Sequence, residues 1–276
     1  MKIGRIVIPL RLIIVLVIIG ISLTILIYRI WFNSDTLQHE KIVVALYSGQ
    51  GTWDESVQAA EKMFQWMNYT VELVSPDVIN SNQFEGFGIL CVPGGDMYQY
   101  AQDISSQGKE NIRNFIRDGG GYIGICGGAY FASETVVWRG NVLPMTPLEL
   151  FQGTAAGPIN EITPDSDFGM CTVNITDSAH PITQIEPQAA TTLYYWGPAL
   201  TPKENAEVTV LGRYAIGNQP AMLAFDYGSG RVFVVGTHPE IEEDSQRDGV
   251  IFADQLDDQG SEWDLMRKAA LWVLEK

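Results

Sequence analysis

The stretch Gly120-Gly-Tyr-Ile-Gly-Ile-Cys-Gly-Gly-Ala129 decides the fold, because it joins a short apolar segment to a helix through a cysteine set among glycines. Tyr122 to Ile125 predicts a strand, and Cys126-Gly-Gly predicts an abrupt turn out of it. This is the pattern of a nucleophile elbow, where side chains two residues before and after the nucleophile would collide. The stretch predicts an α/β protein with Cys126 at the carboxyl end of a strand. The alternative is a buried structural cysteine beside packing glycines.

Working outward, strand and helix patterns alternate. Apolar runs at Lys41–Tyr47 and Gly86–Val92 are typical of strands buried on both faces of a parallel sheet. Between them, Thr52 precedes Glu55 by three residues as a capping box for a helix. Further strands are expected at 69–74, 207–214, 221–226 and 231–235, with the last two joined as a hairpin, and helices around 112–116 and over 261–274. Residues 41–276 therefore read as one α/β domain.

Composition excludes several classes of protein. The 276 residues are 46% hydrophobic and 18% charged, which excludes disorder, and three cysteines cannot form a disulfide scaffold. The net charge is −16 and the basic residues form no long run, so a nucleic-acid partner is not expected. The three histidines show no zinc spacing, so we expect neither a metal nor a cofactor.

The N-terminal segment has the composition of a membrane anchor. No charge interrupts Leu12 to Tyr28, and a bilayer-spanning helix needs about 20 apolar residues. The alternative, a cleaved signal peptide, has a shorter apolar core and ends in small residues, whereas Tyr28-Arg-Ile-Trp-Phe32 follows here. We expect a cytoplasmic N-terminus at 1–11, a transmembrane anchor in the lipid bilayer at 12–30 and a linker at 31–40.

The charges around this segment predict its orientation. Lys2, Arg5 and Arg11 precede the apolar run, whereas Arg29 alone closely follows it. The positive-inside rule therefore predicts a single-pass membrane protein whose N-terminus is cytoplasmic. The globular domain is expected on the extracytoplasmic side.

Residues near two other strand ends can support Cys126. His238 follows the apolar run 232–236, and Glu240 lies two residues on, so Glu240 can orient the imidazole while the other ring nitrogen meets the thiol. The Gly127 N–H is a candidate oxyanion donor, and the loop Gly94-Gly95 offers a second.

The set of candidate oxyanion and substrate-binding residues is Gly94, Gly95, Gly127, Gly128 and Tyr195. For Tyr195, as for its neighbours Tyr194 and Trp196, two interpretations stay open. These aromatic residues either form a pocket wall or fill the core.

Three motifs together give a family resemblance. Val92-Pro-Gly-Gly95, the stretch 120–129 and Tyr227-Gly-Ser-Gly-Arg-Val-Phe-Val-Val-Gly-Thr-His-Pro-Glu240 resemble the class I glutamine amidotransferase-like superfamily. Within it, residues 41–275 are most similar to the N-terminal domain of biotin-protein ligases. The resemblance implies a flavodoxin-like, doubly wound, mostly parallel sheet, with Cys126 as nucleophile, His238 as base and Glu240 as the residue that orients it.

One departure from the superfamily pattern bears on function. Glutaminases of this class usually carry Gly-x-Cys-x-Gly-x-Gln, whereas here Ala129-Tyr130 follows Gly128. The sequence favours a cysteine amidohydrolase acting on a small-molecule amide. The alternative is a binding or sensing module that keeps the pocket without turnover, and biotin-ligase activity is not expected in either case.

Overall fold

The computed structural model describes residues 42–164, 167–243, 245–256 and 260–275. Its strands are β1 (Val43–Tyr47), β2 (Thr70–Val74), β3 (Phe87–Val92), β4 (Gly121–Ile125), β5 (Thr135–Trp138), β6 (Asn141–Val142), β7 (Gly153–Gly157), β8 (Gly169–Ile175), β9 (Ala189–Tyr194), β10 (Ala199–Pro202), β11 (Thr209–Tyr214), β12 (Pro220–Tyr227) and β13 (Gly230–Val235). Its helices are α2 (Asp54–Trp66), α3 (Pro76–Asn80), α4 (Met97–Asp103), α5 (Ser106–Arg117), α6 (Gly127–Ala132) and α7 (Trp263–Leu274).

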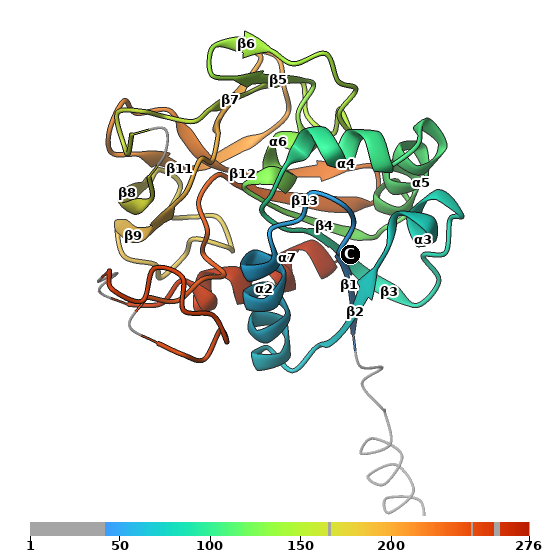
Figure 1. Ribbon diagram of the computed structural model, residues 1–276, viewed down its shortest axis with the longest axis horizontal. Coiled ribbons are helices and arrows are strands. Elements are labelled where there is room, and N and C mark those ends of the chain that lie inside the picture. Colours follow the sequence, from blue (N-terminus) through green and yellow to red (C-terminus); the bar gives the residue numbers. More distant parts are fainter. Residues whose placement is uncertain (1–41, 165–166, 244, 257–259, 276) are drawn as a thin grey trace, which may run out of the picture. The chain divides into compact units, whose positions relative to one another are not determined.

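A nine-stranded sheet in the order β2-β1-β3-β4-β13-β12-β11-β8-β9 forms the centre of the fold (Figure 1). The strands from β2 to β13 in this order run parallel to their neighbours, and β12, β11, β8 and β9 extend the sheet by antiparallel pairing. The prediction of parallel strands therefore holds for β2, β1, β3, β4 and β13, the part of the sheet that leads to Cys126, and the other four strands are antiparallel. The predicted hairpin is confirmed, because β12 and β13 pair antiparallel down to Tyr227 opposite Gly230.

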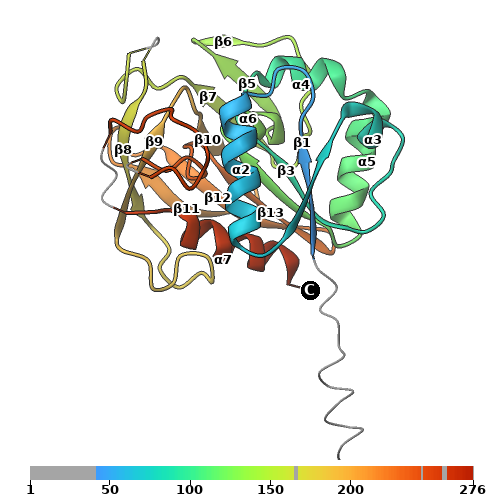
Figure 2. The ribbon, with the colours of Figure 1, turned by 60° about the horizontal axis from the view of Figure 1, so that its bottom comes forward.

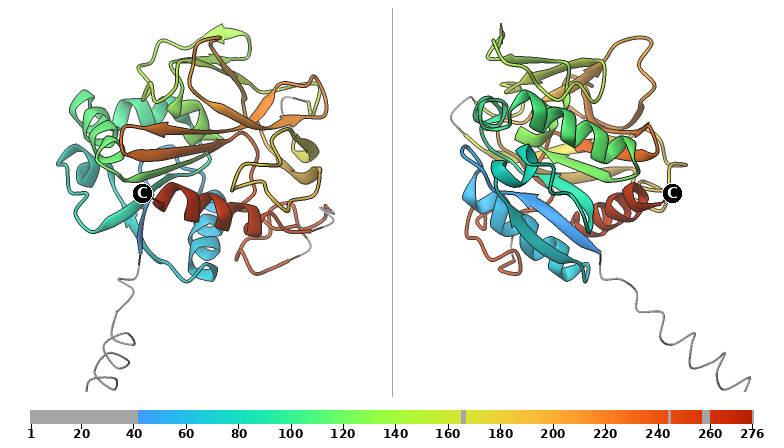
Figure 3. Two further views of the ribbon diagram at one scale, coloured as in Figure 1. Left: turned by 180° about the vertical axis from the view of Figure 1, so that it is seen from behind. Right: turned by 90° about the vertical axis from the view of Figure 1, so that its right-hand side faces the viewer.

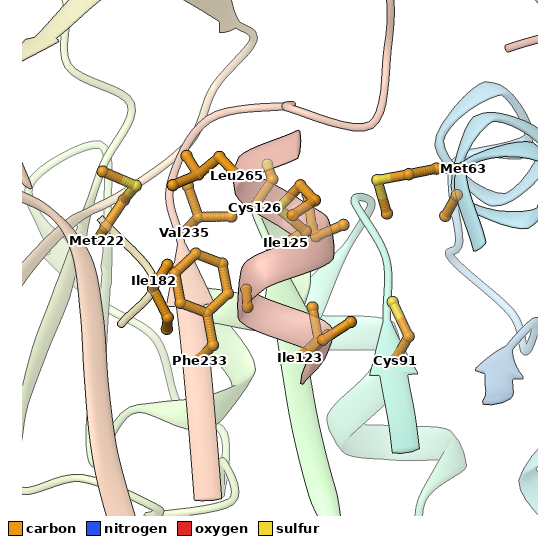
Figure 4. Packing of buried hydrophobic residues seen from close by; sticks show 14 of the residues in the cluster. Met63, Cys91, Ile123, Ile125, Cys126, Ile182, Met222, Phe233, Val235 and Leu265 are labelled. Carbon is orange, nitrogen blue, oxygen red and sulfur yellow. The ribbon is translucent and has the colours of Figure 1, made fainter. Parts of the chain in front are cut away.

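Helices cover both faces of the sheet, as expected for a doubly wound fold. The cause is the two-residue period of the strands, which sends neighbouring side chains to opposite faces. On β3, Cys91 packs in the cluster that holds the buried sides of α2 and α7, whereas Leu90 and Val92 pack with those of α3 to α6. Figures 2 and 3 show α7 and α2 together on one face. In Figure 4, α7 crosses over the side chains of β4 and β13.

A second, four-stranded sheet was not predicted from the sequence. Its order is β10-β7-β5-β6, and it lies near α6 on the same side of the large sheet (Figure 1). Buried Val136, Ala155 and Leu200 join it to the core beneath α6.

The predicted capping box is wrong. Helix α2 begins at Asp54 after Trp53, and no side chain caps it. The Thr52 hydroxyl instead donates to the Gly49 carbonyl at 2.9 Å, inside the turn that follows β1. Helix α2 lies where the apolar spacing predicted a helix. Its start, however, follows the turn at Gly49–Thr52 and involves no Thr–Glu capping pair.

The predicted segments 1–11, 12–30 and 31–40 lie outside the described residues. Within the ranges that the structure describes, each helix is too short or too polar to cross a bilayer.

Candidate active site

Three loops meet where neighbouring parallel strands end. Strands β3, β4 and β13 lie side by side, with Val92 opposite Gly124 and Val235 opposite Ile125. The chain continues from these ends into the Gly94-Gly95 loop, Cys126 and the loop with His238. Open α/β sheets place their sites at such carboxyl ends. The topology therefore brings together residues that lie more than a hundred positions apart.

Cys126 is held in a strained turn between β4 and α6. Its φ of 46° and ψ of −97° lie in a region that residues with side chains rarely adopt. Its N–H donates to the Val235 carbonyl at 2.9 Å, which fixes the turn to the neighbouring strand. A Cβ on Gly128 would lie 2.0 Å from the Val92 carbonyl oxygen, so helix α6 can begin here only with glycine at this position. The geometry is that of a nucleophile elbow.

Two of the four candidate glycines carry free backbone donors. Neither the Gly95 nor the Gly127 N–H has a hydrogen-bond acceptor among the described residues, and a Cβ on Gly127 would touch the backbone of Gly95. These two N–H groups are therefore neighbours beside Cys126. The other two are engaged, because the Gly94 N–H donates to Ser56 Oγ at 2.8 Å and the Gly128 N–H donates to the Pro93 carbonyl at 3.1 Å. The N–H groups of Gly94 and Gly128 are thus used within the protein.

His238 and Glu240 form a buried pair. His238 Nδ1 lies 2.8 Å from Glu240 Oε1, and both side chains are almost fully enclosed. The Ser56 hydroxyl donates to the same carboxylate oxygen at 2.6 Å. Ser56 thereby connects Glu240 to the Gly94 N–H and hence to the loop that carries Gly95. The sequence analysis missed Ser56, since a serine on the buried face of a helix has no pattern that marks it.

The second ring nitrogen of His238 faces Cys126. His238 Nε2 lies 3.3 Å from the Tyr195 carbonyl oxygen, and Cys126 Sγ lies 3.6 Å from the same oxygen. Burial lowers the pKa of His238, but the negative charges of the Cys126 thiolate and Glu240, with hydrogen bonds to both, outweigh it and raise the pKa well above its usual value. The raised pKa favours a protonated His238 imidazole beside Cys126.

The other two cysteines are packed in the core. Cys91 and Cys171 are free and buried, and burial is the main cause that raises the pKa of each thiol far above its usual value. Both thiols are therefore expected to be inert. Cys126 differs because it lines a cavity.

Tyr195 belongs to a loop that three tyrosine hydroxyls hold in place. Tyr130 donates to the Trp196 carbonyl at 2.9 Å, Tyr194 to the Gly197 carbonyl at 2.8 Å and Tyr214 to the Pro198 carbonyl at 2.8 Å. The two open interpretations of the aromatic run both apply. Tyr194 is fully buried, whereas Tyr195 and Trp196 line the cavity.

A cavity of about 620 Å³ opens over Cys126 and His238. It is lined largely by aromatic and apolar side chains from the loops at the strand ends, from helices α4 and α6, and from strand β5. The lining residues are Trp53, Gly95, Asp96, Met97, Tyr98, Cys126, Tyr130, Trp138, Leu143, Pro144, Tyr195, Trp196 and His238. Trp53, Tyr98 and Trp138 carried no signal in the sequence that separated them from core aromatics.

His180 does not join this site. His180 lies at a different cavity, where its Nδ1 accepts the Ile182 N–H at 3.2 Å. In the part of the chain that the structure describes, no group of three or more metal-binding side chains forms.

Comparison with known proteins places this geometry in a family. The family model described as "Biotin-protein ligase, N terminal" matches residues 42–270. The biotin–protein ligase of Schizosaccharomyces pombe is 30% identical over 162 residues, which cover 55% of this chain and 25% of the ligase. An uncharacterised protein of Chlamydia muridarum is 36% identical over 74 residues, 25% of this chain and 29% of that protein. The chain thus spans a quarter to a third of the length of these curated relatives.

Solved structures share the fold. PurLQS from Thermotoga maritima aligns with a TM-score of 0.58 at 14% identity and covers 85% of this chain and 100% of that one. A glutamine amidotransferase from the same organism aligns with a TM-score of 0.54 at 10% identity, covering 86% and 100%. The fold is therefore that of the glutamine amidotransferase-like proteins, and the chain belongs to the family of biotin-protein ligase N-terminal domains.

Proposed function

We propose that the domain is a cysteine-dependent hydrolase of small amides, in which Cys126, His238 and Glu240 act as a triad. The observation that carries the proposal is the buried His238–Glu240 pair beside a cysteine at a strained elbow. Glu240 Oε1 holds Nδ1 at 2.8 Å, which leaves Nε2 directed to the side where Cys126 lies. Such a base, oriented by a third group, is what activates a thiol nucleophile.

The reaction follows from these positions. His238 Nε2 takes the thiol proton, and Cys126 Sγ attacks the amide carbonyl carbon, whose oxygen becomes an oxyanion held by the Gly95 and Gly127 N–H groups. The C–N bond breaks as the imidazolium protonates the leaving amine, and a thioester remains on Cys126. Water, deprotonated by His238, then attacks the thioester, so that a carboxylic acid leaves and the thiol is restored.

The pH dependence of Cys126 alkylation tests the activated thiol. The full chain is treated with iodoacetamide from pH 5 to 9, and each cysteine is followed by peptide mass spectrometry. Because the pKa of His238 is raised, the imidazolium that stabilises the thiolate persists at low pH and is lost as pH rises through that pKa. Cys126 should stay reactive well below pH 8, where an ordinary thiol slows about tenfold per pH unit.

The controls lie in the same chain. His238→Ala should abolish the low-pH reactivity of Cys126, while buried Cys91 and Cys171 should stay unmodified in both proteins. Incubation with the p-nitrophenyl ester of phenylacetic acid should then give an acyl adduct on Cys126 that decays with time. If Cys126 reacts as an ordinary thiol, the hydrolase proposal fails and the binding or sensing module becomes the better account.

We also propose that residues 12–30 anchor the domain in a lipid bilayer, with the domain on the extracytoplasmic side. The support is the uncharged apolar run and the basic residues that precede it.

A further inference from the structure

We propose that the cavity over Cys126 selects amides with an aromatic body and no negative charge, and that it favours a positive charge on the group bound there. This inference rests on the proposed function, since it names the substrate class of the same site. It follows from three features of the cavity: a continuous aromatic wall, a carboxylate at its edge, and the absence of lysine and arginine from the lining that the structure describes.

The wall is a chain of ring contacts. Trp53 lies edge-on to Tyr195 with ring centres 5.2 Å apart, and Tyr195 lies 4.6 Å from Trp196. Trp196 in turn meets Trp138 edge-on at 6.1 Å, and Trp138 meets Tyr130 at 5.9 Å. All five rings line the cavity. Ring faces carry a partial negative charge, so a wall of this kind attracts aromatic groups and organic cations.

The position of Trp196 in this wall is imposed by its surroundings. Tyr130 anchors the Trp196 backbone through its hydroxyl, and Trp196 itself has a φ of 60°, which a side-chain-bearing residue keeps only when its surroundings impose it. Tyr130 stands where glutaminases of the superfamily usually carry glutamine. In this chain the residue at that position donates a hydrogen bond to the backbone of Trp196, which belongs to the aromatic wall.

The charges at the cavity disfavour an anion. Asp96 is the sole carboxylate in the described lining, and no lysine or arginine belongs to that lining. Asp96 is exposed, and its Oδ1 accepts the Tyr98 N–H at 2.9 Å, which holds the carboxylate in position. The imidazolium of His238 is already paired with Glu240 and Cys126. Arg139 packs over the Trp138 ring at 5.6 Å without joining the lining.

These features bear directly on glutamine. Free glutamine carries a carboxylate beside its ammonium group, and no lysine or arginine of the described lining would meet that carboxylate. Desolvating a carboxylate without a counter-charge is costly. A neutral ring has no such penalty, and the desolvation cost of a cation is offset by the rings and by Asp96.

An isosteric series of ligands tests this selection apart from catalysis. Phenylacetamidine, phenylacetamide and phenylacetate have nearly the same shape and carry positive, zero and negative charge at neutral pH. Their affinities for the full chain with Cys126→Ser are measured by isothermal titration calorimetry. We expect the amidinium to bind about tenfold more tightly than the carboxylate, with the amide between them.

Three variants locate the cause. Asp96→Asn keeps an acceptor for the Tyr98 N–H and should reduce the gap between amidinium and amide. Trp138→Leu should weaken all three ligands, whereas Trp66→Leu, at an exposed position on α2 outside the cavity, should not. Phenylacetate binding as tightly as the amidinium, or no binding by any of the three, overturns the inference. If Cys126 is alkylated like an ordinary thiol, the hydrolase proposal is wrong, but the expected order of affinities of the three ligands is unaffected.

Discussion

Ser56 connects the carboxylate of Glu240 to the loop that carries Gly94 and Gly95. It is fully buried, donates to Glu240 Oε1 and accepts the Gly94 N–H. Ser56→Ala removes both hydrogen bonds and leaves the Gly94 N–H buried without a partner, at a cost of about 1–3 kcal/mol in the free energy of unfolding. We expect this loss in chemical denaturation. The exposed Ser81→Ala serves as the control.

A merely structural role for Ser56 would not alter the chemistry of Cys126. As a positioning residue, Ser56 should also affect the pH profile of alkylation, with the low-pH rate of Cys126 reduced about tenfold in Ser56→Ala. An unchanged profile in a folded variant would show that Glu240 is held without the serine.

The charge of Glu240 can be separated from its shape. In Glu240→Gln the side-chain oxygen can still accept from His238 and Ser56, but the negative charge that raises the pKa of His238 is lost. The imidazolium then loses its proton at lower pH, so the alkylation rate of Cys126 at pH 6 should fall about tenfold. Glu85→Gln removes an exposed carboxylate and should leave the rate unchanged. An equal rate in both variants would argue against Glu240 as the orienting group.

At this scale, the sequence predicted the three residues of the proposed triad but not the side chains that hold them in place. Cys126, His238 and Glu240 could be predicted, because glycines and strand ends mark their positions. Ser56 could not, since it pairs with a residue 184 positions away and only the folded sheet brings the two together. The sequence also could not show that the Gly94 and Gly128 N–H groups have acceptors within the protein, because these acceptors lie on other elements of the fold.

Among the elements, α6 packs against β3 more closely than a side chain allows. A Cβ on Gly128 would lie 2.0 Å from the Val92 carbonyl oxygen, and this neighbour is backbone in the centre of the sheet. Gly128→Ala should therefore lower the free energy of unfolding by about 1–3 kcal/mol or more, and reduce the reactivity of Cys126 by moving the elbow. Thermal unfolding checks the first effect.

Gly169→Ala on β8 is the matched control, because its Cβ would meet only the end of the Thr163 side chain at 3.2 Å. If the two variants melt at the same temperature, the close contact between α6 and β3 does not limit stability.

The elements that could be predicted are those with a strong period. The buried parallel strands read as apolar runs because both of their faces are covered, and α5 and α7 show helical spacing. The small sheet could not be predicted, since β5, β6 and β10 have two to four residues each and lie among glycines and prolines. Yet β5 supplies Trp138 to the cavity, so part of the site rests on the least predictable elements.

At the scale of the whole molecule, acidity and the cavity act in the same direction. A net charge of −16 raises the local concentration of cations and repels anions, which complements the selection expected from the aromatic wall. The sequence predicted the acidity but not its relation to the site, because that relation depends on which charges line the cavity.

The proposed membrane anchor makes a separate prediction for the full chain. Expressed in cells, it should remain in the membrane pellet after alkaline carbonate extraction. Ile21→Arg places a charge at the centre of the proposed span 12–30, at a cost of about 2.5–3.5 kcal/mol for insertion, and should release much of the protein, whereas Ile21→Leu should not. Release of the unsubstituted chain would rule out the anchor.

Orientation is tested on intact cells with a membrane-impermeant maleimide, in a Cys126→Ser background where Cys91 and Cys171 are buried. Ser34→Cys should be labelled from outside and Gly4→Cys only after the cells are opened, because the basic residues before the run predict a cytoplasmic N-terminus. The reverse pattern would place the cavity in the cytoplasm, where it would meet a different set of amides.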